Sequence, residues 1–250
     1  MALFADTFSR YFEPENLTAA LAVLDSAGCR VHLPKAPGWP RRPLCCGRTF
    51  LAVGLVDEAR REAERCIAAL APFARRGIDV VGLEPSCVLG FRDEIPALVK
   101  SDDARMLAGH VLLFEEYLER ARGEGGLALA LKPLVQRALL HGHCHQKSFA
   151  VMPAVEATLR RIPGLTVETV DSSCCGMAGS FGYAADTIDV SLKMGELSLF
   201  PAVRNAEHAI VVADGTSCRH QIRDGTGRDA LHVARVLAMS INADAPGVTA

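Results

Sequence analysis

Two pairs of adjacent cysteines stand out in this chain of 250 residues. The motif Cys174-Cys175-Gly176 has a counterpart in Cys45-Cys46-Gly47. Neighbouring side chains on extended backbone point in opposite directions, so both thiols can face one small object only where the chain turns sharply. A glycine directly after the pair permits such a turn, because glycine adopts positive φ without steric cost. Each pair is therefore expected in a tight turn that presents two thiols together.

Two further cysteines flank the second pair. Cys144 precedes it within His143–Lys147, and Cys218 follows it. Four thiolates converging from three loops are the ligand set of both iron–sulfur clusters and structural zinc. Zinc sites usually use Cys-x-x-Cys pairs on small knuckles, and this sequence contains none. The spacing therefore favours a larger object such as a cluster, with ordinary buried cysteines as the alternative interpretation.

The first pair has a less complete set of partners. Cys45 and Cys46 are followed by Cys87, but Asp6 stands where the second half has Cys144. A carboxylate is a harder ligand than a thiolate, less suited to iron–sulfur clusters and acceptable to zinc. Three interpretations stay open: a zinc site with three thiolates and Asp6, a second cluster with an unusual ligand, or a decayed site.

Histidines lie close to the thiols of the second half. His143 and His145 flank Cys144, and His220 follows Cys218 by two positions. They are candidates for hydrogen bonds to cluster sulfur or for proton relay, and the alternative is that they are solvated loop residues. The remaining cysteines, Cys29 and Cys66, are expected to be small core residues.

The composition is that of an ordinary globular protein, with 50% hydrophobic residues and a net charge of −2. It gives no electrostatic footprint for nucleic acid. No apolar stretch approaches the roughly 20 residues that span a bilayer, and no basic-then-apolar signal sequence opens the chain. Nine cysteines, an odd number that includes two adjacent pairs, argue against an extracellular disulfide framework. We therefore expect a cytoplasmic protein.

Strands leading into the cysteine motifs alternate with helices. In the first half the patterns predict strands over 2–8, 30–33 and 78–83, and helices over 15–27, 56–74 and 104–122. The glycine-rich segment Gly123–Gly126 is the expected domain boundary. Such alternation implies a parallel sheet with helices packed outside, and ligands then bind at the edge where the strand C-termini gather.

The second half repeats this order. It predicts strands over 139–143, 165–170 and 209–213, and helices over 151–161, 186–205 and 229–239. Asp6 then aligns with Cys144, and Cys87 with Cys218. We predict an α/β fold of two tandem repeats, residues 1–122 with a degenerate ligand set and residues 127–250 with the full four-cysteine set. The cysteine loops are expected at the strand C-terminal edge.

These motifs resemble the cysteine-rich CCG domain family, which includes the cysteine-rich subunit of heterodisulfide reductase and the iron–sulfur subunits of glycolate and lactate oxidases. The segments Asp6–Phe8, Gly82–Cys87, His143–Lys147 and Ser173–Gly179 are most similar to one branch. That branch is the C-terminal region of fused FAD/iron–sulfur dehydrogenases acting on D-2-hydroxy acids such as D-lactate. The resemblance covers nearly the whole chain.

One departure from the family bears on the chemistry. In heterodisulfide reductase the last element of the motif is Cys-x-x-Cys, which gives five thiolates for a non-cubane cluster. Here Glu84 and Gly215 occupy the first of those positions. Four thiols remain in the second half, which suits an ordinary [4Fe–4S] cluster and disfavours disulfide-reducing chemistry.

The resemblance implies an electron-transfer module that passes electrons from a flavoprotein oxidising a 2-hydroxy acid toward a quinone-type acceptor. The expected cluster ligands are Cys144, Cys174, Cys175 and Cys218, and the expected zinc or second-cluster ligands are Asp6, Cys45, Cys46 and Cys87. The alternatives are a cluster-based thiol–disulfide reductase and a zinc-stabilised scaffold without redox activity.

The implied partners follow from what this sequence lacks. It contains neither an FAD-binding region nor a closely spaced ferredoxin-type cysteine run. We therefore expect FAD on a partner or on a missing N-terminal region, and a ferredoxin-type iron–sulfur subunit or domain as a second partner. Any association with the inner membrane would come through these partners.

Overall fold

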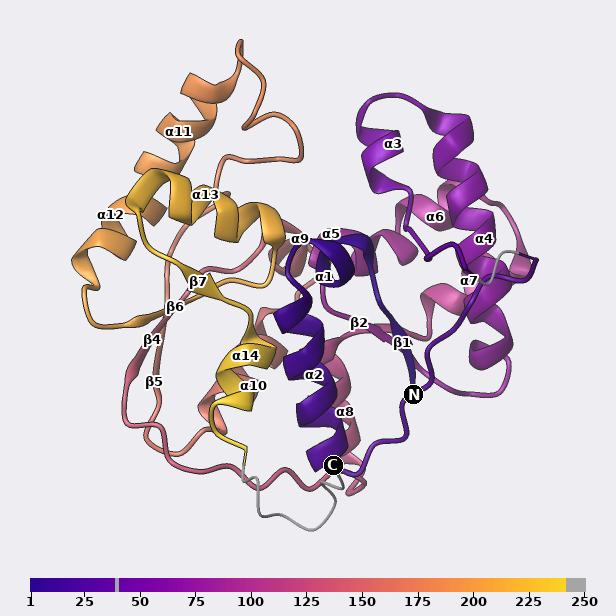
Figure 1. The fold of residues 1–250 in the computed structure, drawn as a ribbon, viewed down its shortest axis with the longest axis horizontal. Coiled ribbons are helices and arrows are strands. Elements are labelled where there is room, and N and C mark those ends of the chain that lie inside the picture. The colour runs from indigo at the N-terminus through magenta and orange to yellow at the C-terminus, as the bar shows by residue number, and fades with distance from the viewer. Residues whose placement is uncertain (39–40, 242–250) are drawn as a thin grey trace. The chain divides into compact units, whose positions relative to one another are not determined.

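The computed structural model describes residues 1–38 and 41–241 and divides the chain into two compact α/β units (Figure 1). The first unit covers Met1–Leu129, and the second begins at Ala130. This division lies shortly after the glycine-rich segment in which the boundary was expected. Among the described residues, no helix is both long enough and apolar enough to cross a bilayer.

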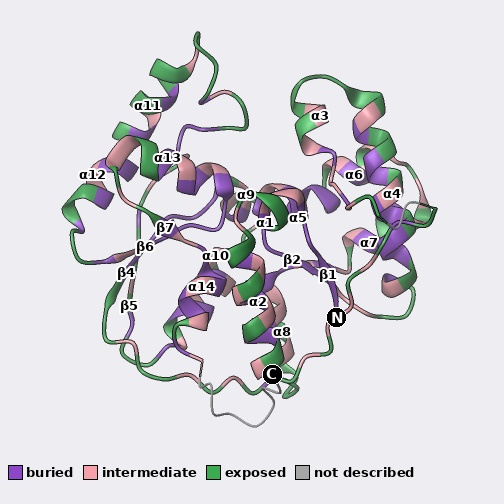
Figure 2. Cartoon of the chain, viewed as in Figure 1, coloured by how far each residue is buried: buried purple, intermediate pink, exposed green. Residues whose placement is uncertain are grey.

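The first unit is built on a parallel sheet in the order β1-β2-β3. Its strands are β1 (Ala2–Phe4), β2 (Val80–Gly82) and β3 (Val111–Leu113). Its helices are α1 (Thr7–Tyr11), α2 (Pro14–Ser26), α3 (Arg48–Ala52), α4 (Val56–Ala74), α5 (Pro85–Val88), the 3-10 turn Leu89–Phe91, α6 (Glu94–Leu98), α7 (Asp102–Ala108) and α8 (Phe114–Gly123). Every residue of β1 and β2 is buried (Figure 2), because helices α4, α5 and α8 pack on the sheet.

The second unit has a parallel sheet in the order β5-β4-β6-β7. Its strands are β4 (Arg137–Leu140), β5 (Thr166–Thr169), β6 (Ile210–Val212) and β7 (Ala230–Leu231). Its helices are α9 (Cys144–Ser148), α10 (Met152–Arg160), α11 (Ile188–Glu196), α12 (Leu199–Asn205), α13 (Thr216–Thr226) and α14 (Val233–Ala238). The edge strand β5 is mostly exposed, whereas β4 and β6 are mostly buried.

The two units place their elements in the same order. In each, the first strand (β1 or β4) leads into a short helix and then a longer one, and the chain returns alongside that strand. In the second unit the returning segment is strand β5, which pairs with β4. In the first unit it forms only a single parallel bridge, between Ala2 and His32. The next inner strand (β2 or β6) leads into the helix that carries the last cysteine. The parallel α/β class is confirmed, and the interpretation as a tandem repeat stays a prediction.

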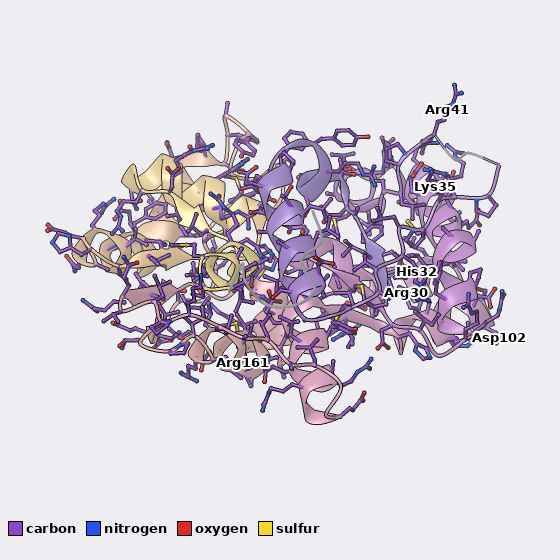
Figure 3. All side chains as sticks on the ribbon, turned by 60° about the horizontal axis from the view of Figure 1, so that its bottom comes forward. Arg30, His32, Lys35, Arg41, Asp102 and Arg161 are labelled. Atoms are coloured by element: carbon purple, nitrogen blue, oxygen red, sulfur yellow. The ribbon has the colours of Figure 1, made fainter. Side chains whose placement is uncertain are left out.

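Several helices lie where the apolar periodicity and the end signals predict them. Helix α4 coincides with the expected 56–74, burying Cys66 and Leu70 and leaving its charged residues outside except for Glu62. Helix α2 begins at Pro14, and Gly28, with φ +71°, follows its end. Charged residues such as Asp102 lie on the periphery (Figure 3).

The expected single helix over 104–122 is wrong. The structure divides it into α7, β3 and α8. Leu107 and Leu118 are buried as expected, but the apolar run Val111–Leu113 pairs with β2 instead of continuing a helix. Tertiary pairing outweighs local periodicity here, since three consecutive apolar residues suit a buried parallel strand.

The expected helix over 186–205 is also interrupted, between α11 and α12. Pro201 lacks the N–H that would bond to the carbonyl of Leu197, and its ring would clash with that carbonyl. Other elements are also shorter than expected. The strand over 2–8 ends at Phe4, the strand over 30–33 is reduced to the bridge at His32, and the helix over 229–239 begins at Val233, after β7.

Candidate metal centre

The second unit presents its first thiol at the start of a helix. Strand β4 leads through a short loop into α9, whose first residue is Cys144. His143 caps this helix: its Nδ1 accepts a hydrogen bond from the backbone N–H of His145 at 3.1 Å. Gln146 completes the cap by accepting one from the backbone N–H of His143 at 3.0 Å. Reciprocal capping fixes a helix start, so the exposed thiol of Cys144 is held at a defined place.

The cysteine pair lies in a turn that only glycine can close. Gly176 has φ +98°, and a Cβ atom on it would lie 2.2 Å from the carbonyl oxygen of Ser191. The backbone N–H of Gly176 donates to Sγ of Cys174 at 3.3 Å. The predicted tight turn with positive φ is confirmed, and the turn itself supplies a hydrogen bond to one of the thiols.

The last thiol of this unit lies on α13, behind a second obligatory glycine. Cys218 is the third residue of that helix, and Gly215 is its N-terminal cap. A Cβ atom on Gly215 would lie 2.4 Å from Cδ2 of His143 and 3.4 Å from Sγ of Cys218. The site therefore has no room for a side chain at position 215, where heterodisulfide reductase has a fifth cysteine.

The structure brings the four predicted thiols of the second unit together. The thiol of Cys174 lies next to those of Cys144 and Cys175, and the thiol of Cys175 also lies next to that of Cys218, with the two sulfurs within 4.8 Å of each other. These contacts lower the pKa of the Cys174 and Cys218 thiols and raise the pKa of the Cys144 and Cys175 thiols. Thiolates are the metal-binding form of cysteine, so Cys174 and Cys218 are the thiols best prepared to bind a metal cation.

The group of four thiols is partly buried in the second unit and partly exposed to solvent. Cys175 and Cys218 are 3% and 2% exposed and belong to the hydrophobic core around Phe200 and Ile222, whereas Cys144 is exposed. Surroundings of this kind hold a metal group away from bulk water on one side and leave one ligand accessible.

A buried polar network joins the two helices that carry Cys144 and Cys218. Gln146 donates from Nε2 to Oδ2 of Asp214 at 2.7 Å, and Asp214 accepts from the backbone N–H of Val233 at 3.0 Å. Gln146 and Asp214 are at most 1% exposed. Buried polar groups are costly unless they are hydrogen-bonded, so the satisfied network fixes α9 relative to the segment that precedes α13.

The three histidines expected near the cluster have different roles. His143 is the buried cap of α9 described above, and its Nδ1 lies 3.9 Å from Sγ of Cys144. His145 is half-buried in the first turn of the same helix. His220 is hydrogen-bonded to the hydroxyl of exposed Tyr183, with 3.1 Å between Nδ1 and the oxygen. Of these three, His143 lies near the Cys144 thiol through its ring, and His145 through its backbone.

A fourth histidine, which the sequence analysis did not single out, lies among the thiols. His141 is 1% exposed, and a ring nitrogen lies within 4.8 Å of the sulfurs of both Cys175 and Cys218. Its Nδ1 is 2.9 Å from Oγ of Ser172, directly before the cysteine pair. His141 stands three positions before Cys144, and a histidine that follows a buried strand would have been the sequence signal.

The first unit also brings its three predicted thiols together. Cys45 is hydrogen-bonded to Cys46, and Sγ of Cys46 lies 3.0 Å from Sγ of Cys87. Gly47, with φ +80°, closes the turn after the pair, and a Cβ atom on it would lie 2.8 Å from the carbonyl oxygen of Ala59. Cys87 is the third residue of α5, as Cys218 is of α13.

Asp6 has a structural task near these thiols. It is the N-terminal cap of α1: Oδ1 accepts from the backbone N–H groups of Phe8 and Ser9, each at 2.9 Å, and Oδ2 accepts from Oγ of Ser9 at 2.7 Å. Burial, and then the neighbouring Glu84, raise the pKa of Asp6 to about 6. By its place in the helix, the counterpart of Cys144 is Thr7, the first residue of α1, which is hydrogen-bonded to Cys45.

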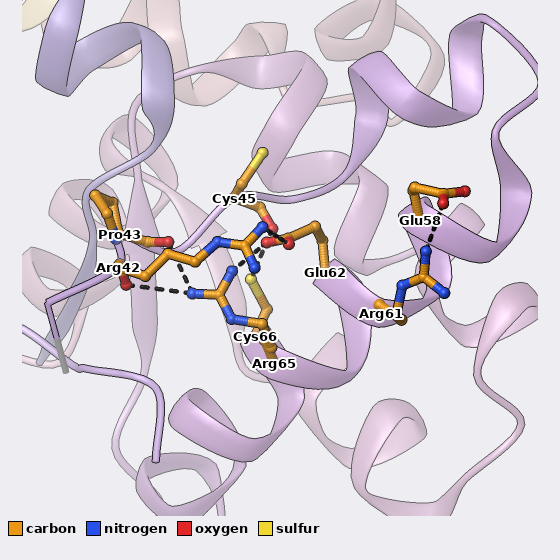
Figure 4. A network of polar contacts seen from close by, with 8 residues as sticks. All are labelled: Arg42, Pro43, Cys45, Glu58, Arg61, Glu62, Arg65 and Cys66. Carbon is orange, nitrogen blue, oxygen red and sulfur yellow. Dashed lines mark hydrogen bonds and ion pairs between the residues drawn. The ribbon is translucent and has the colours of Figure 1, made fainter. Parts of the chain in front are cut away.

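Helix α4 fixes the loop that carries the first pair (Figure 4). Glu62, only 3% exposed, forms ion pairs with Arg42 and Arg65. The thiol of Cys66 donates to the carbonyl oxygen of Cys45 at 3.1 Å. Cys66 is buried as expected, and it also holds the backbone of the cysteine pair in place.

The donor sets of the two units fit different metal groups. The second unit offers four soft thiols in one group, the ligand set of an iron–sulfur cluster. The first offers three, and the carboxylate of Asp6 already accepts hydrogen bonds at both oxygens. A cluster with four protein thiolates does not fit the first unit, whereas three thiolates suit a zinc ion with a further ligand.

A comparison with protein families identifies the cysteine-containing region of the second unit. Residues 138–223, which contain all four thiols of the second unit and His141, match the family model described as a cysteine-rich domain, CCG.

Three curated proteins illustrate the similarity over nearly the whole chain. One subunit of the anaerobic glycerol-3-phosphate dehydrogenase of Escherichia coli (strain K12) is 29% identical over 242 residues, 96% of this chain and 59% of that protein. D-2-hydroxyglutarate dehydrogenase of the same strain is 27% identical over 226 residues, 89% of this chain and 21% of that protein. Lactate utilization protein A of Bacillus velezensis is 24% identical over 256 residues, 95% of this chain and 98% of that protein. This chain therefore spans three fifths or less of the two dehydrogenase proteins.

Proposed function

We propose that this chain, whose residues 138–223 form a cysteine-rich domain of the CCG family, is the iron–sulfur electron-transfer module of a dehydrogenase. Cys144, Cys174, Cys175 and Cys218 would hold one [4Fe–4S] cluster. The observation that carries the proposal is the gathering of these four thiols in one group. Two of the similar proteins are named as a dehydrogenase or as part of one, which supports the redox class.

The residues of this chain would hold and shield the group. The turn at Gly176 and the helix starts at Cys144 and Cys218 set the positions of the ligands. The hydrophobic core around Cys175 excludes water from one side. When bound, an iron–sulfur cluster supplies one-electron transfer, and its potential depends on hydrogen bonds to sulfur and on exposure.

The substrate and the partners belong to the same proposal. The donor would be an FAD-bearing dehydrogenase that oxidises a 2-hydroxy acid, and the acceptor a quinone-type molecule reached through a ferredoxin-type iron–sulfur subunit or domain. The names of the D-2-hydroxyglutarate and lactate-utilization proteins support an acid of this class. The cysteine content favours a reducing compartment, the cytoplasm, with the inner membrane reached through partners.

The metal content tests the proposal directly. Purified without oxygen, the chain should be brown, contain iron and acid-labile sulfide in equal amounts, and show an EPR signal when reduced. Cys174→Ser should lose this iron, whereas Cys29→Ser, which removes a thiol outside both sites, should keep it. A colourless protein that holds only zinc after reconstitution would refute the proposal and leave the zinc-stabilised scaffold.

The first unit is proposed to hold a mononuclear zinc ion. Cys45, Cys46 and Cys87 supply three thiols close together. Both carboxylate oxygens of Asp6 already accept hydrogen bonds, so an experiment must decide whether Asp6 is the fourth ligand. Zinc that disappears in Cys87→Ser and persists in Asp6→Asn would identify three thiolates as the protein ligands. Loss of zinc in both variants would make Asp6 a ligand, and a zinc-free wild-type chain would contradict the assignment.

A further inference from the structure

His141 is buried among the thiols of the second unit without a complete set of partners. Its ring is 1% exposed, and among the described residues its Nε2 has no hydrogen-bond partner of good geometry. Nδ1 is engaged with Oγ of Ser172 at 2.9 Å. The sulfurs of Cys175 and Cys218 lie within 4.8 Å of a ring nitrogen. Since Nδ1 is occupied, Nε2 is the nitrogen left for the sulfurs.

The contacts of Ser172 favour one tautomer of the His141 ring. Nζ of Lys147 contacts Oγ of Ser172 at 3.4 Å and also donates to the backbone carbonyl of the same residue. An ammonium group has only donors, so the serine oxygen accepts from Lys147 and has its own hydrogen available to donate to Nδ1 of His141. The imidazole then carries its hydrogen on Nε2.

We propose that His141 is a positioning residue of the second site, donating an Nε2–H hydrogen bond to the sulfurs of Cys175 and Cys218 and thereby raising the reduction potential of the metal group they hold. Lys147 and Ser172 hold the ring in the donating tautomer. For an iron–sulfur cluster the inference rests on the proposed function. The hydrogen bond itself is a property of this chain's own residues.

The sign of the effect follows from charge. A hydrogen-bond donor at a thiolate withdraws electron density from sulfur and stabilises the reduced group, which carries the additional negative charge. Hydrogen bonds to charged partners are stronger than those between neutral groups, and the buried site screens them little. Removing the donor should therefore make reduction less favourable.

The first unit has no equivalent donor in the segment that corresponds to His141. The stretch Leu3–Ala5, which lies between the interior of β1 and the cap residue Asp6, is entirely apolar and buried. The corresponding stretch of the second unit, from Leu140 to Gly142, contains His141. At this position the imidazole is thus present in the unit with four thiols and absent from the unit with three.

The test compares His141→Leu, which fills the space without a donor, with His141→Gln, whose amide N–H can reach the position of Nε2. Reduction is followed by equilibrium redox titration with EPR detection at one pH, and iron and sulfide are measured per chain. His141→Leu should keep its iron and lower the equilibrium constant for reduction about tenfold, which is about 59 mV for a one-electron couple. His141→Gln should recover most of this change, and Ser172→Ala should shift the potential in the same direction by less.

Several results would overturn the inference. An unchanged potential in His141→Leu would show that the ring makes no hydrogen bond that matters to the group. Loss of iron in both His141→Leu and His141→Gln would make His141 a ligand or a core residue instead of a donor. A potential lowered equally in both variants would also contradict the inference, because the restored N–H would then have had no effect.

The test also separates this inference from the proposed function. If the wild-type chain takes up no iron–sulfur cluster, the proposed function fails, and the same variants are loaded with Co²⁺. A hydrogen bond to thiolate lowers the energy of the sulfur electrons, so the thiolate-to-cobalt charge-transfer band should move to longer wavelength in His141→Leu and return in His141→Gln. A band at the same wavelength in all three proteins would refute the inference.

Discussion

The two cysteine sites share the same turn and helix-start geometry and differ at one of the predicted ligand positions. In both units a glycine with positive φ follows the cysteine pair, and the last cysteine is the third residue of a helix. The first residue of the preceding short helix is Cys144 in the second unit and Thr7 in the first. The comparison shows that the backbone arrangement is retained where one ligand is replaced.

The electrostatic surroundings of the two sites also differ. In the first unit the hydrogen bond with Cys46 lowers the pKa of the Cys87 thiol, but burial and the neighbouring Asp6 and Glu84 outweigh it and raise that pKa to about 12. In the second unit the hydrogen bond from Cys175 lowers the pKa of Cys218. The pKa values of the two corresponding thiols are therefore shifted in opposite directions.

Removing one thiol from each site gives the largest expected difference. Cys174→Ser should abolish nearly all iron binding, because Cys174 is the thiol that joins Cys144 to Cys175. Cys45→Ser should leave most of the iron in place. Iron and sulfide analysis of the two purified variants decides the matter. Equal losses would show that both units hold clusters or share one, which would remove the proposed distinction.

Adding a fourth thiol to the first unit should reduce the difference in iron binding between the two units. Thr7→Cys places a fourth thiol at the helix position of Cys144, next to Cys45. We expect additional iron and sulfide per chain after reconstitution, measured on a Cys174→Ser background that leaves the second site empty.

The matched control for this experiment is Asp6→Cys. That variant puts the thiol at the N-terminal cap and also removes the cap, at a cost of about 1 kcal/mol of stability. Iron gained by Asp6→Cys instead of Thr7→Cys would show that Asp6, as the sequence alignment suggests, is the true counterpart of Cys144.

The buried carboxyl of the first unit should make stability depend on pH. The pKa of Asp6 rises from 3.8 to about 6 on folding, so the folded chain binds this proton more tightly than the unfolded chain. Its contribution to stability is complete below pH 3.8 and is lost as the pH rises through 6, with a total of about 3 kcal/mol.

Asp6→Asn keeps a capping oxygen and removes the titration. In the metal-free chain, the fall in the free energy of unfolding between pH 4 and pH 6 should become smaller by about 2 kcal/mol in urea titrations, which is the part of the total that is lost within this range. Asp102→Asn, at a side chain that is 96% exposed, should leave the fall unchanged. A wild-type stability that does not fall over this range would contradict the raised pKa of Asp6.

The smallest effect is expected at the ion pairs that hold the first loop. The side chain of Arg42 is 52% exposed, so Arg42→Ala should cost less than about 1 kcal/mol. The side chain of Arg65 is 14% exposed and pairs with the same buried Glu62, so Arg65→Ala should cost more. Thermal unfolding of both variants measures which one loses more stability. An equal loss would show that burial of the arginine does not determine the contribution of the ion pair.

The sequence alone determined the α/β class, the thiols and the glycine turns. Local chemistry decides these features: apolar runs form buried strands, and a pair of adjacent thiols followed by glycine must turn. The helix over 56–74 was predicted to the residue, because its ends and its apolar face are set within the segment itself. The segment 138–223, which carries the four thiols, matches the CCG family model.

Only the tertiary structure decided which neighbours the thiols have. Val111–Leu113 became a strand because β2 lies beside it, which no local pattern reports. His141 faces the sulfurs because the chain from β4 and the turn after Ser172 meet there. Asp6, predicted as a ligand from its alignment with Cys144, caps α1, because the helix begins one residue later than the alignment assumes. Contacts between distant segments depend on how the chain packs, and sequence spacing does not contain that information.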